Sequence, residues 1–220
     1  MQSVPNWASF GPVNPSGIRA FDGNDTVTGS SANDIINGNR GDDNLSGAQG
    51  YDFLRGGKNP DIISGDAGND ILNGNKGDDI VEGNLGEDIV RGGQGDDQLF
   101  GNDGDDVVIG DDGVDILTGG FGADAFVLNA NDLAVNELTT DEIADFFPVV
   151  DGDIILSDGI DRAEVTFDDA ANVGGAPGTN DTVIRFGGQV LGVALDVDRT
   201  TVFDNFYTID ANSPLVTTIG

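Results

Sequence analysis

The chain has 220 residues, of which 40 are acidic and 9 are basic, giving a formal net charge of −31 at pH 7. A field of this sign repels nucleic acid and anionic membranes and attracts cations. The chain contains no cysteine and no histidine, which excludes disulfides, thiolate metal sites and the usual general base.

Residues 1–19 form a short lead before a repetitive segment. The lead begins MQSVPNWASF and has neither a basic region nor an apolar run, so it does not resemble an N-terminal secretory signal. No stretch of the chain approaches the roughly 18 apolar residues of a membrane span. Trp7 and Phe10 are expected to cap the exposed first coil of the structure that follows, and a floppy tail is the alternative.

A nine-residue pattern repeats twelve times in residues 20–128 without a shift in register, which predicts a solenoid. With Gly38 counted as a first position, glycine fills the first and fourth positions of nearly every copy. Gly, Asn or Asp are common at the second position. These residues tolerate a positive φ, so positions one to six are expected to form a turn.

The last three positions of each copy carry an apolar residue in the middle, which predicts a short strand facing a core. These eighth-position residues are Val27, Ile36, Leu45, Leu54, Ile63, Leu72, Val81, Val90, Leu99, Val108, Leu117 and Phe126. Nine residues make half a coil, so copies two apart are expected to lie on the same side of the solenoid.

Aspartate occupies the sixth position of every copy and therefore forms two columns. One column holds Asp25, Asp43, Asp61, Asp79, Asp97 and Asp115, and the other holds Asp34, Asp52, Asp70, Asp88, Asp106 and Asp124. At a strand spacing of about 4.8 Å, unscreened carboxylates repel by about 1 kcal/mol per pair in water. The columns therefore require a counter-cation. Carboxylate and carbonyl oxygens suit Ca²⁺ better than Mg²⁺, and turn capping without metal is the alternative.

The copies resemble the nonapeptide GGxGxDxUx of the RTX (repeats-in-toxin) family. This resemblance implies an all-β fold, a right-handed parallel β-roll (solenoid), with Ca²⁺ held between turns by the sixth-position aspartates and by main-chain carbonyls. The implied fourth-position carbonyl ligands are Gly23, Gly41, Gly50, Gly68, Gly77, Gly86, Gly95, Gly104, Gly113 and Gly122. The implied second-position carbonyl ligands are Asn39, Ala48, Gly57, Asp66, Asn75, Asn84, Gly93, Asn102, Asp111 and Gly120. Adjacent pairs within each column of six give at most ten sites, and roughly six to nine are expected to be occupied.

Two copies depart from the pattern at the fourth position. One has Ala32, and another has Asn59 followed by Pro60. Asparagine accepts a positive φ moderately well and alanine does not, so weaker sites are expected at Asp34 and, to a lesser degree, at Asp61.

Residues 129–220 are expected to form a β-rich C-terminal module. The strand-like runs there and just before it are AFVLN, DEIADFF, DIILS, AEVTF, TVIRF, QVLGVAL and VFDNFYTI. The pattern FVL…D-I-x-D-F…D-x-I-x-L resembles the C-terminal cap of RTX proteins, although the spacer before Asp141 is longer than usual. This resemblance implies a cap that seeds folding beside an uncleaved type I secretion signal, and hence a secreted or cell-surface protein.

The seventh positions are expected to point outward on two unlike faces. One face carries an apolar ladder of Ile35, Phe53, Ile71, Ile89, Val107 and Ala125, while the other carries Thr26, Asn44, Ile62, Ile80, Gln98 and Ile116. The ladder is a candidate surface for a protein partner, for self-association or for packing against the flanking segments. Ordinary β-propensity on a solvated sheet is the alternative.

The sequence therefore predicts a secreted calcium-binding protein, not an enzyme, whose roll folds when it binds extracellular Ca²⁺. The chain has no HExxH motif, and without histidine it cannot build a Ser-His-Asp triad. Two alternatives stay open: a surface-layer or adhesive matrix protein that self-associates in Ca²⁺, and a carboxylate-only glycosidase. The acidic residues for such an enzyme would be Asp141, Glu142, Asp145, Asp151 and Asp153.

Overall fold

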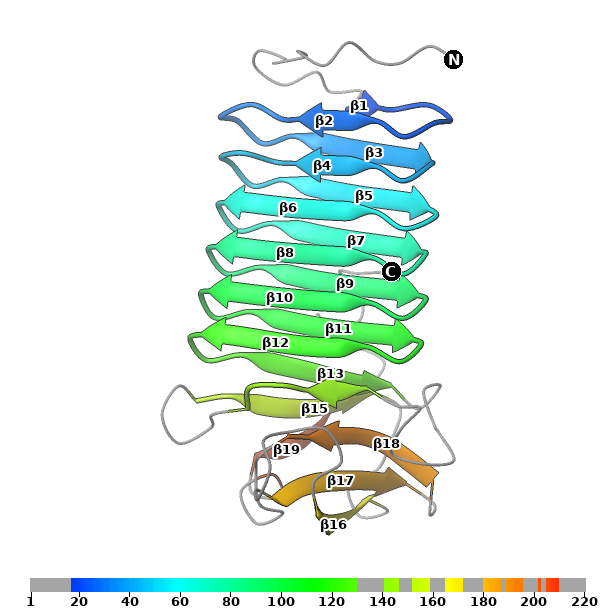
Figure 1. Ribbon diagram of the computed structural model, residues 1–220. Helices are drawn as coiled ribbons and strands as arrows, with labels where there is room; N and C mark the ends of the chain where they lie inside the picture. Colours follow the sequence, from blue (N-terminus) through cyan, green and yellow to red (C-terminus); the bar gives the residue numbers. More distant parts are fainter. Residues whose placement is uncertain are drawn as a thin grey trace.

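The computed structural model describes residues 17–129, 141–146, 152–158, 165–171, 180–186, 189–195, 202 and 205–209. In these segments the chain is built from β-strands arranged in two sheets, between which the backbone passes back and forth (Figure 1). Nine strands form sheet A and ten form sheet B. None of the described segments forms a helix long and apolar enough to cross a membrane.

Sheet A contains the odd-numbered strands of the stack. In spatial order they are β1 (Ile18–Arg19), β3 (Ile35–Arg40), β5 (Phe53–Lys58), β7 (Ile71–Lys76), β9 (Ile89–Gln94), β11 (Val107–Asp112), β13 (Ala125–Asn129), β15 (Ile154–Asp158) and β19 (Phe206–Ile209). All neighbours in this sheet pair in parallel.

Sheet B contains the even-numbered strands of the stack, with a C-terminal meander at its end. In spatial order they are β2 (Thr26–Thr28), β4 (Asn44–Ser46), β6 (Ile62–Ala67), β8 (Ile80–Leu85), β10 (Gln98–Asp103), β12 (Ile116–Phe121), β14 (Glu142–Ile143), β18 (Gln189–Ala194), β17 (Asn180–Phe186) and β16 (Val165–Ala171). Only the β16–β17 and β17–β18 pairs are antiparallel.

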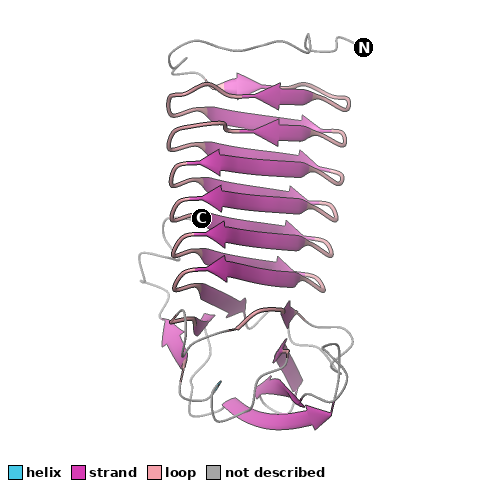
Figure 2. Ribbon diagram, turned by 60° about the vertical axis from the view of Figure 1, so that its left-hand side comes forward, coloured by secondary structure: helices cyan, strands magenta, loops and turns pink. Residues whose placement is uncertain are grey.

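The register of the sheets confirms that two nonapeptides make one coil. Ile35 pairs with Phe53 in sheet A, and Ile62 pairs with Ile80 in sheet B, so each residue lies beside the one 18 positions later. The fold class is therefore confirmed as all-β with a parallel β-solenoid of about six turns (Figure 2).

Most strands of the roll are longer than the sequence suggested. β3 and all strands from β5 to β12 span six residues, from a seventh position to the third position of the next copy. The prediction of a turn over positions one to six is therefore wrong for positions one to three. A residue such as Asn75, with φ 77°, stays within the strand because Gly93 beside it also has a positive φ.

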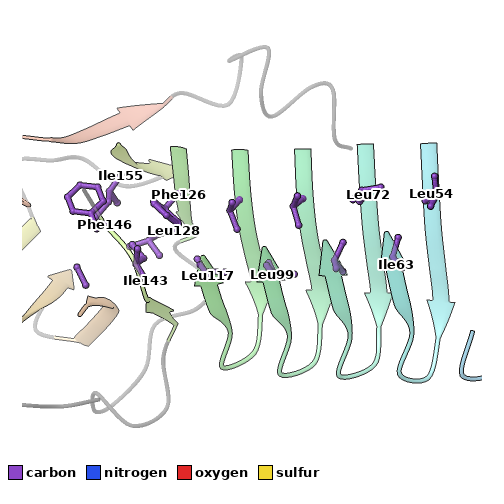
Figure 3. Packing of buried hydrophobic residues seen from close by; sticks show 14 of the residues in the cluster. Leu54, Ile63, Leu72, Leu99, Leu117, Phe126, Leu128, Ile143, Phe146 and Ile155 are labelled. Atoms are coloured by element: carbon purple, nitrogen blue, oxygen red, sulfur yellow. The ribbon is translucent and has the colours of Figure 1, made fainter. Parts of the chain in front are cut away.

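The core lies between the two sheets and is formed by the eighth-position side chains, all of which are at most 3% exposed. In Figure 3, Leu54 and Leu72 from sheet A point towards Ile63, Leu99 and Leu117 from sheet B. One large apolar residue per half-coil fills the interior, because the next inward position is a glycine.

The stack continues beyond the repeats. β14 pairs with β12 and β15 pairs with β13, so segments without the nine-residue period add a further coil. Ile143 and Ile155 occupy the core positions of that coil. The ring of Phe146 packs edge-on against Phe126, with 6.3 Å between centroids. Each of the seven strand-like runs predicted from the sequence overlaps one of the strands β13 to β19.

The outer face of sheet A has an apolar cluster at its C-terminal end. Ile109, Val127 and Leu156 point away from the core and are nevertheless buried, and Val107 and Ala125 pack against them. The apolar ladder is therefore most exposed at its other end, where Ile35 is 55% and Phe53 is 39% exposed. Predictions for the aromatic N-terminal cap and for a signal in the last residues fall outside the described segments.

Candidate metal centre

The two aspartate columns form the edges of the roll, directly before each strand. All twelve sixth-position side chains are between 0% and 7% exposed, although carboxylates are rarely buried without partners. The turn at positions four to six brings each aspartate inward, and the parallel register places it above the aspartate 18 residues away. The two columns predicted from the sequence are therefore present in the structure.

A hydrogen-bond ladder holds one oxygen of each carboxylate. The backbone N–H of each aspartate donates to Oδ1 of the aspartate one coil later, as Asp61 does to Asp79 at 2.7 Å and Asp88 does to Asp106 at 2.7 Å. The same bond recurs along both columns with lengths of 2.6 to 3.1 Å. This ladder fixes the rotamer and leaves the second oxygen, Oδ2, to a different partner.

The second carboxylate oxygen is buried and lacks a hydrogen-bond donor along most of both columns. These atoms are Oδ2 of Asp43, Asp52, Asp61, Asp70, Asp79, Asp88, Asp97, Asp106, Asp115, Asp124 and Asp141. A buried charge without a partner is strongly unfavourable, so these oxygens require either protons or cations.

Burial also raises the pKa values of these carboxyl groups, because the charged form loses its hydration. It raises the pKa of Asp61 to about 7 and that of Asp97 to about 8. In each case the hydrogen bond from the preceding coil lowers the pKa and so offsets part of the rise. Like charges above and below add to the rise: Asp79 and Asp43 for Asp61, and Asp115 and Asp79 for Asp97. Each column is therefore a line of carboxylates that is unstable at neutral pH unless positive charge balances it.

The first-position glycines leave space beside the orphaned oxygens. A Cβ on Gly38 would lie 2.4 Å from Asp43 Oδ2 and 2.5 Å from the carbonyl oxygen of Gly56. A Cβ on Gly74 would likewise lie 2.3 Å from Asp79 Oδ2 and 2.8 Å from the Gly92 carbonyl. None of these first-position glycines has a positive φ, so backbone conformation does not require glycine here. The lack of space for a Cβ does.

The ligand set expected from the sequence does not include the first-position carbonyls that lie beside this space. They belong to Gly47, Gly56, Gly65, Gly83, Gly92, Gly101, Gly110 and Gly119. The constancy of glycine at the first position was the available signal. It was read only as tolerance of positive φ, whereas the structure shows a steric requirement.

The predicted second- and fourth-position carbonyls point along the stack. A Cβ on Gly86 would lie 1.8 Å from the Gly68 carbonyl oxygen, and one on Gly57 would lie 2.3 Å from that of Asn39. In the described turns, no backbone hydrogen bond ends on a fourth-position carbonyl, so these oxygens are free of donors. Fourth-position glycines have φ values of 126° to 157° where these turns are regular.

The two irregular copies differ from each other. Asn59 adopts a positive φ of 79°, and Asp61 keeps an orphaned Oδ2 like its neighbours. Ala32 does not adopt a positive φ, and Oδ2 of Asp34 accepts hydrogen bonds from the backbone N–H and Oγ of Ser30, at 2.6 and 2.9 Å. Oδ2 of Asp34 thus has protein donors, as has Oδ2 of Asp25, which accepts the N–H of Phe21 at 3.2 Å, whereas Oδ2 of the other ten sixth-position aspartates has none.

Both columns extend one coil past the repeats. Asp141 and Asp153 are 0% and 1% exposed, and they accept the backbone N–H groups of Asp115 and Asp124, each at 3.1 Å. The signal in the sequence was the triplet of aspartate, any residue and an apolar residue, found in DEI and DII. Asp145, in contrast, accepts the N–H groups of Gly119 and Gly120, at 2.8 and 2.9 Å.

The donor set contains only oxygens. Across the described segments, no three acidic side chains converge on one point, so backbone carbonyls would have to complete any coordination sphere. Paired carboxylates with several carbonyls match the preference of Ca²⁺ for six to eight oxygen ligands. The residues present therefore fit calcium.

Comparison with known proteins points to the same ion. A family model described as an RTX calcium-binding nonapeptide repeat, four copies long, matches residues 19–54, 55–90 and 91–126. A solved structure of an extracellular lipase from Serratia marcescens aligns with 82% of this chain at 17% identity and a TM-score of 0.30. The chain spans 39% of the length of that lipase chain. No curated protein sequence matches the chain.

Proposed function

Because residues 19–126 make the chain a member of the RTX calcium-binding nonapeptide repeat family, we propose that it is a secreted protein whose β-roll folds on binding extracellular Ca²⁺. Repeats of this family bind Ca²⁺, so the chain is a calcium-binding β-roll protein. Export, the coupling of folding to calcium and the ligand assignment are parts of the proposal.

The observation that carries the proposal is the row of buried Oδ2 atoms without donors in each column. Bound Ca²⁺ would supply positive charge between adjacent coils and so remove the cost of burying these carboxylates. The chain contributes the rest: the N–H ladder orients each carboxylate, the first-position glycines leave space, and the turns present carbonyl oxygens. Each coil completes the donor set of its neighbour, which makes folding cooperative.

The proposed ligands are the sixth-position aspartates with backbone carbonyls from the first, second and fourth positions. With Asp141 and Asp153 included, each column has seven aspartates and six adjacent pairs, or twelve pairs in all. The expected number of bound ions stays roughly six to nine, because the Ser30 contacts of Asp34 weaken the first coil.

A calcium titration followed by circular dichroism tests the proposal. Sites of extracellular type have dissociation constants of about 10⁻⁴ to 10⁻³ M, so the chain is expected to be unfolded in EGTA and to gain β-structure cooperatively near millimolar Ca²⁺. Mg²⁺ at the same concentration serves as the control. A roll already formed in excess EGTA would contradict coupled folding.

A surface-layer or adhesive role, with self-association in Ca²⁺, is the second candidate. It is favoured by the exposed end of the apolar ladder, Ile35 and Phe53. Size-exclusion chromatography with and without Ca²⁺ distinguishes a monomer from an assembling protein, and Ile71→Asp with Ile89→Asp should abolish assembly through this ladder.

Catalysis by carboxylates is disfavoured by the contacts of the candidate residues. Asp141 and Asp153 extend the two columns, and Asp145 holds two backbone N–H groups. Asp151 lies outside the described residues. The matched family is a calcium-binding module, and we infer that this chain is not an enzyme.

A further inference from the structure

The basic residues of the roll are not distributed evenly. The chain has only 9 lysines and arginines, and six of them lie on strands of sheet A. These six are Arg19, Arg40, Arg55, Lys58, Lys76 and Arg91. The strands of sheet B from β2 to β12 carry none.

Two columns of polar side chains arise from this placement. At the ninth position, Arg55 pairs in register with Asn73, which in turn pairs with Arg91, so arginine alternates with asparagine. At the third position, Arg40 lies beside Lys58, and Lys76 follows on the next strand. Neighbouring strands lie about 4.8 Å apart, so the third-position cations form a closely spaced row.

The two columns border a continuous depression across sheet A, called the basic groove below. One part has a volume of ≈ 490 Å³ and the next part ≈ 470 Å³. The two parts share Arg55, Asn75 and Lys76. Asp22 lies at one end, and Asp111 and Asp112 lie at the other, so the groove cations are confined to the strands from β3 to β9.

Within the described segments, most of these cations form no ion pair with the protein's own acids. Arg91 forms an ion pair with Asp111. Arg40, Arg55, Lys58 and Lys76 take part in no ion pair with the described residues. In a chain of net charge −31, four cations left beside one another with acids available elsewhere indicate an anionic ligand.

We propose that the basic groove binds an acidic polysaccharide that runs across the strands of sheet A. The cations would contact carboxylate or sulfate groups, and the amides of Asn37, Asn73 and Asn75 would contact hydroxyls. The length of one sugar unit in a polysaccharide is roughly the spacing between strands. Acid groups on successive sugar units would therefore meet cations on successive strands.

Two features favour a polysaccharide over a nucleic acid. The groove residues include no aromatic side chain, so bases have no stacking platform. The surrounding acidity also disfavours a polymer as densely charged as nucleic acid. The aspartate columns lie at the edges of the roll, whereas the side chains of Arg40, Lys58 and Lys76 lie in the groove on sheet A, so these cations are not among the proposed calcium ligands.

The test compares two double variants with equal change in net charge. Lys58→Gln with Lys76→Gln removes two groove cations, whereas Gln49→Glu with Gln98→Glu adds two acids at exposed positions on the sheet B side. Binding is measured by titration calorimetry in saturating Ca²⁺ with oligogalacturonate, a heparin oligosaccharide, neutral dextran and single-stranded DNA. Calcium-induced circular dichroism shows separately whether each variant folds.

The expected result is binding of an acidic oligosaccharide that weakens about tenfold in the lysine variant and stays within about twofold in the glutamate variant. The two acidic sugars distinguish carboxylate from sulfate recognition. Three outcomes overturn the proposal: equal weakening in both variants, DNA binding as tightly as the sugars, or no sugar binding by a folded protein. A lysine variant that instead loses a dimer present in the wild type would assign the groove to self-association.

Discussion

The carboxylate of Asp79 has two oxygens in different surroundings. Oδ1 accepts the N–H of Asp61 at 2.7 Å, whereas Oδ2 is buried without a donor. Burial raises the pKa of this group to about 6, the hydrogen bond opposes the rise, and the charge of Asp78 adds to it. The charged side chain therefore destabilises the metal-free roll and is needed only when a cation is present.

Asp79→Asn is therefore expected to act in opposite directions with and without calcium. In Ca²⁺ it removes an anionic ligand from two sites, so the calcium midpoint of folding should rise by roughly tenfold or more. In EGTA it removes a buried charge, so residual structure should increase. Circular dichroism titrations measure both effects.

Asp78→Asn is the matched control, because Asp78 is exposed and changes the net charge equally. Its Oδ1 accepts the N–H of Asp96 at 3.1 Å, and asparagine keeps that oxygen. Equal midpoint shifts in the two variants would show that overall charge, not ligation, controls folding.

Acid is expected to substitute for calcium in part. Burial raises the pKa of Asp52 and Asp106 to about 7 and that of Asp97 to about 8, against about 3.9 in an unfolded chain. Protonation therefore favours the folded form. This stabilisation is complete below about pH 4 and is lost as pH rises through 6 to 8.

Circular dichroism in EGTA between pH 4 and 9 should accordingly show β-structure at the acidic end only. In Ca²⁺ the effect of acid on folding reverses, because protons compete with the ion for the carboxylates. The Ca²⁺ concentration at the midpoint of folding should therefore increase as pH falls below about 6. A metal-free chain that gains structure as the pH is raised would contradict this account.

At the scale of elements, the last coil differs from the others. β14 and β15 continue the stack with a sequence that lacks the nonapeptide, yet their aspartates and core residues take the repeat positions. Phe146 packs against Phe126, where the core of the repeats passes into the C-terminal part of the core, and is only 2% exposed. This coil shields the final repeat from solvent, as terminal repeats of solenoids must.

Phe146→Ala is expected to destabilise the calcium-loaded protein by about 3–5 kcal/mol, because it opens a cavity in the core next to the last repeat. Urea unfolding at saturating Ca²⁺ measures the loss. Phe121→Ala provides the control, since Phe121 is 77% exposed at the end of β12 and its removal should have little effect. Similar losses in both variants would contradict a core role for Phe146.

For the molecule as a whole, a net charge of −31 is expected to keep the chain expanded until calcium neutralises the columns. An unfolded chain of 220 residues has a radius of gyration of about 50 Å, and a compact globule of that length about 17 Å. Small-angle X-ray scattering in EGTA should therefore give a radius of gyration near that of the unfolded chain. In Ca²⁺ the radius of gyration should fall by about half and stay above that of a compact globule, because the roll is elongated.

That contraction should occur over the same calcium range as the change in circular dichroism, since stacking couples the coils. Contraction at much lower calcium would indicate collapse before strand formation. High NaCl without calcium serves as the control for simple screening, and it should cause far less contraction because monovalent ions bind such sites weakly.

The sequence by itself determined the coil, the core and the two columns. A nine-residue period with an apolar eighth position and Asp at the sixth permits only one strand register. A shift of one residue would move Leu72 or Asp70 from the inner face of the sheet to the outer face. Twelve repetitions of the same local rule also made Ala32 and Asn59 recognisable as departures. These features are local, so they can be read from one copy at a time.

The tertiary structure alone decided the features that depend on contacts between coils. The strands extend to six residues because a residue with positive φ, such as Asn75, pairs with a residue that also has a positive φ in the neighbouring coil. Asp141 and Asp153 joined the columns although irregular spacers separate them from the repeats, because strand pairing places them there. Which carboxylate oxygen stays without a donor follows from a hydrogen bond across 18 residues, and that bond exists only once the coils are stacked.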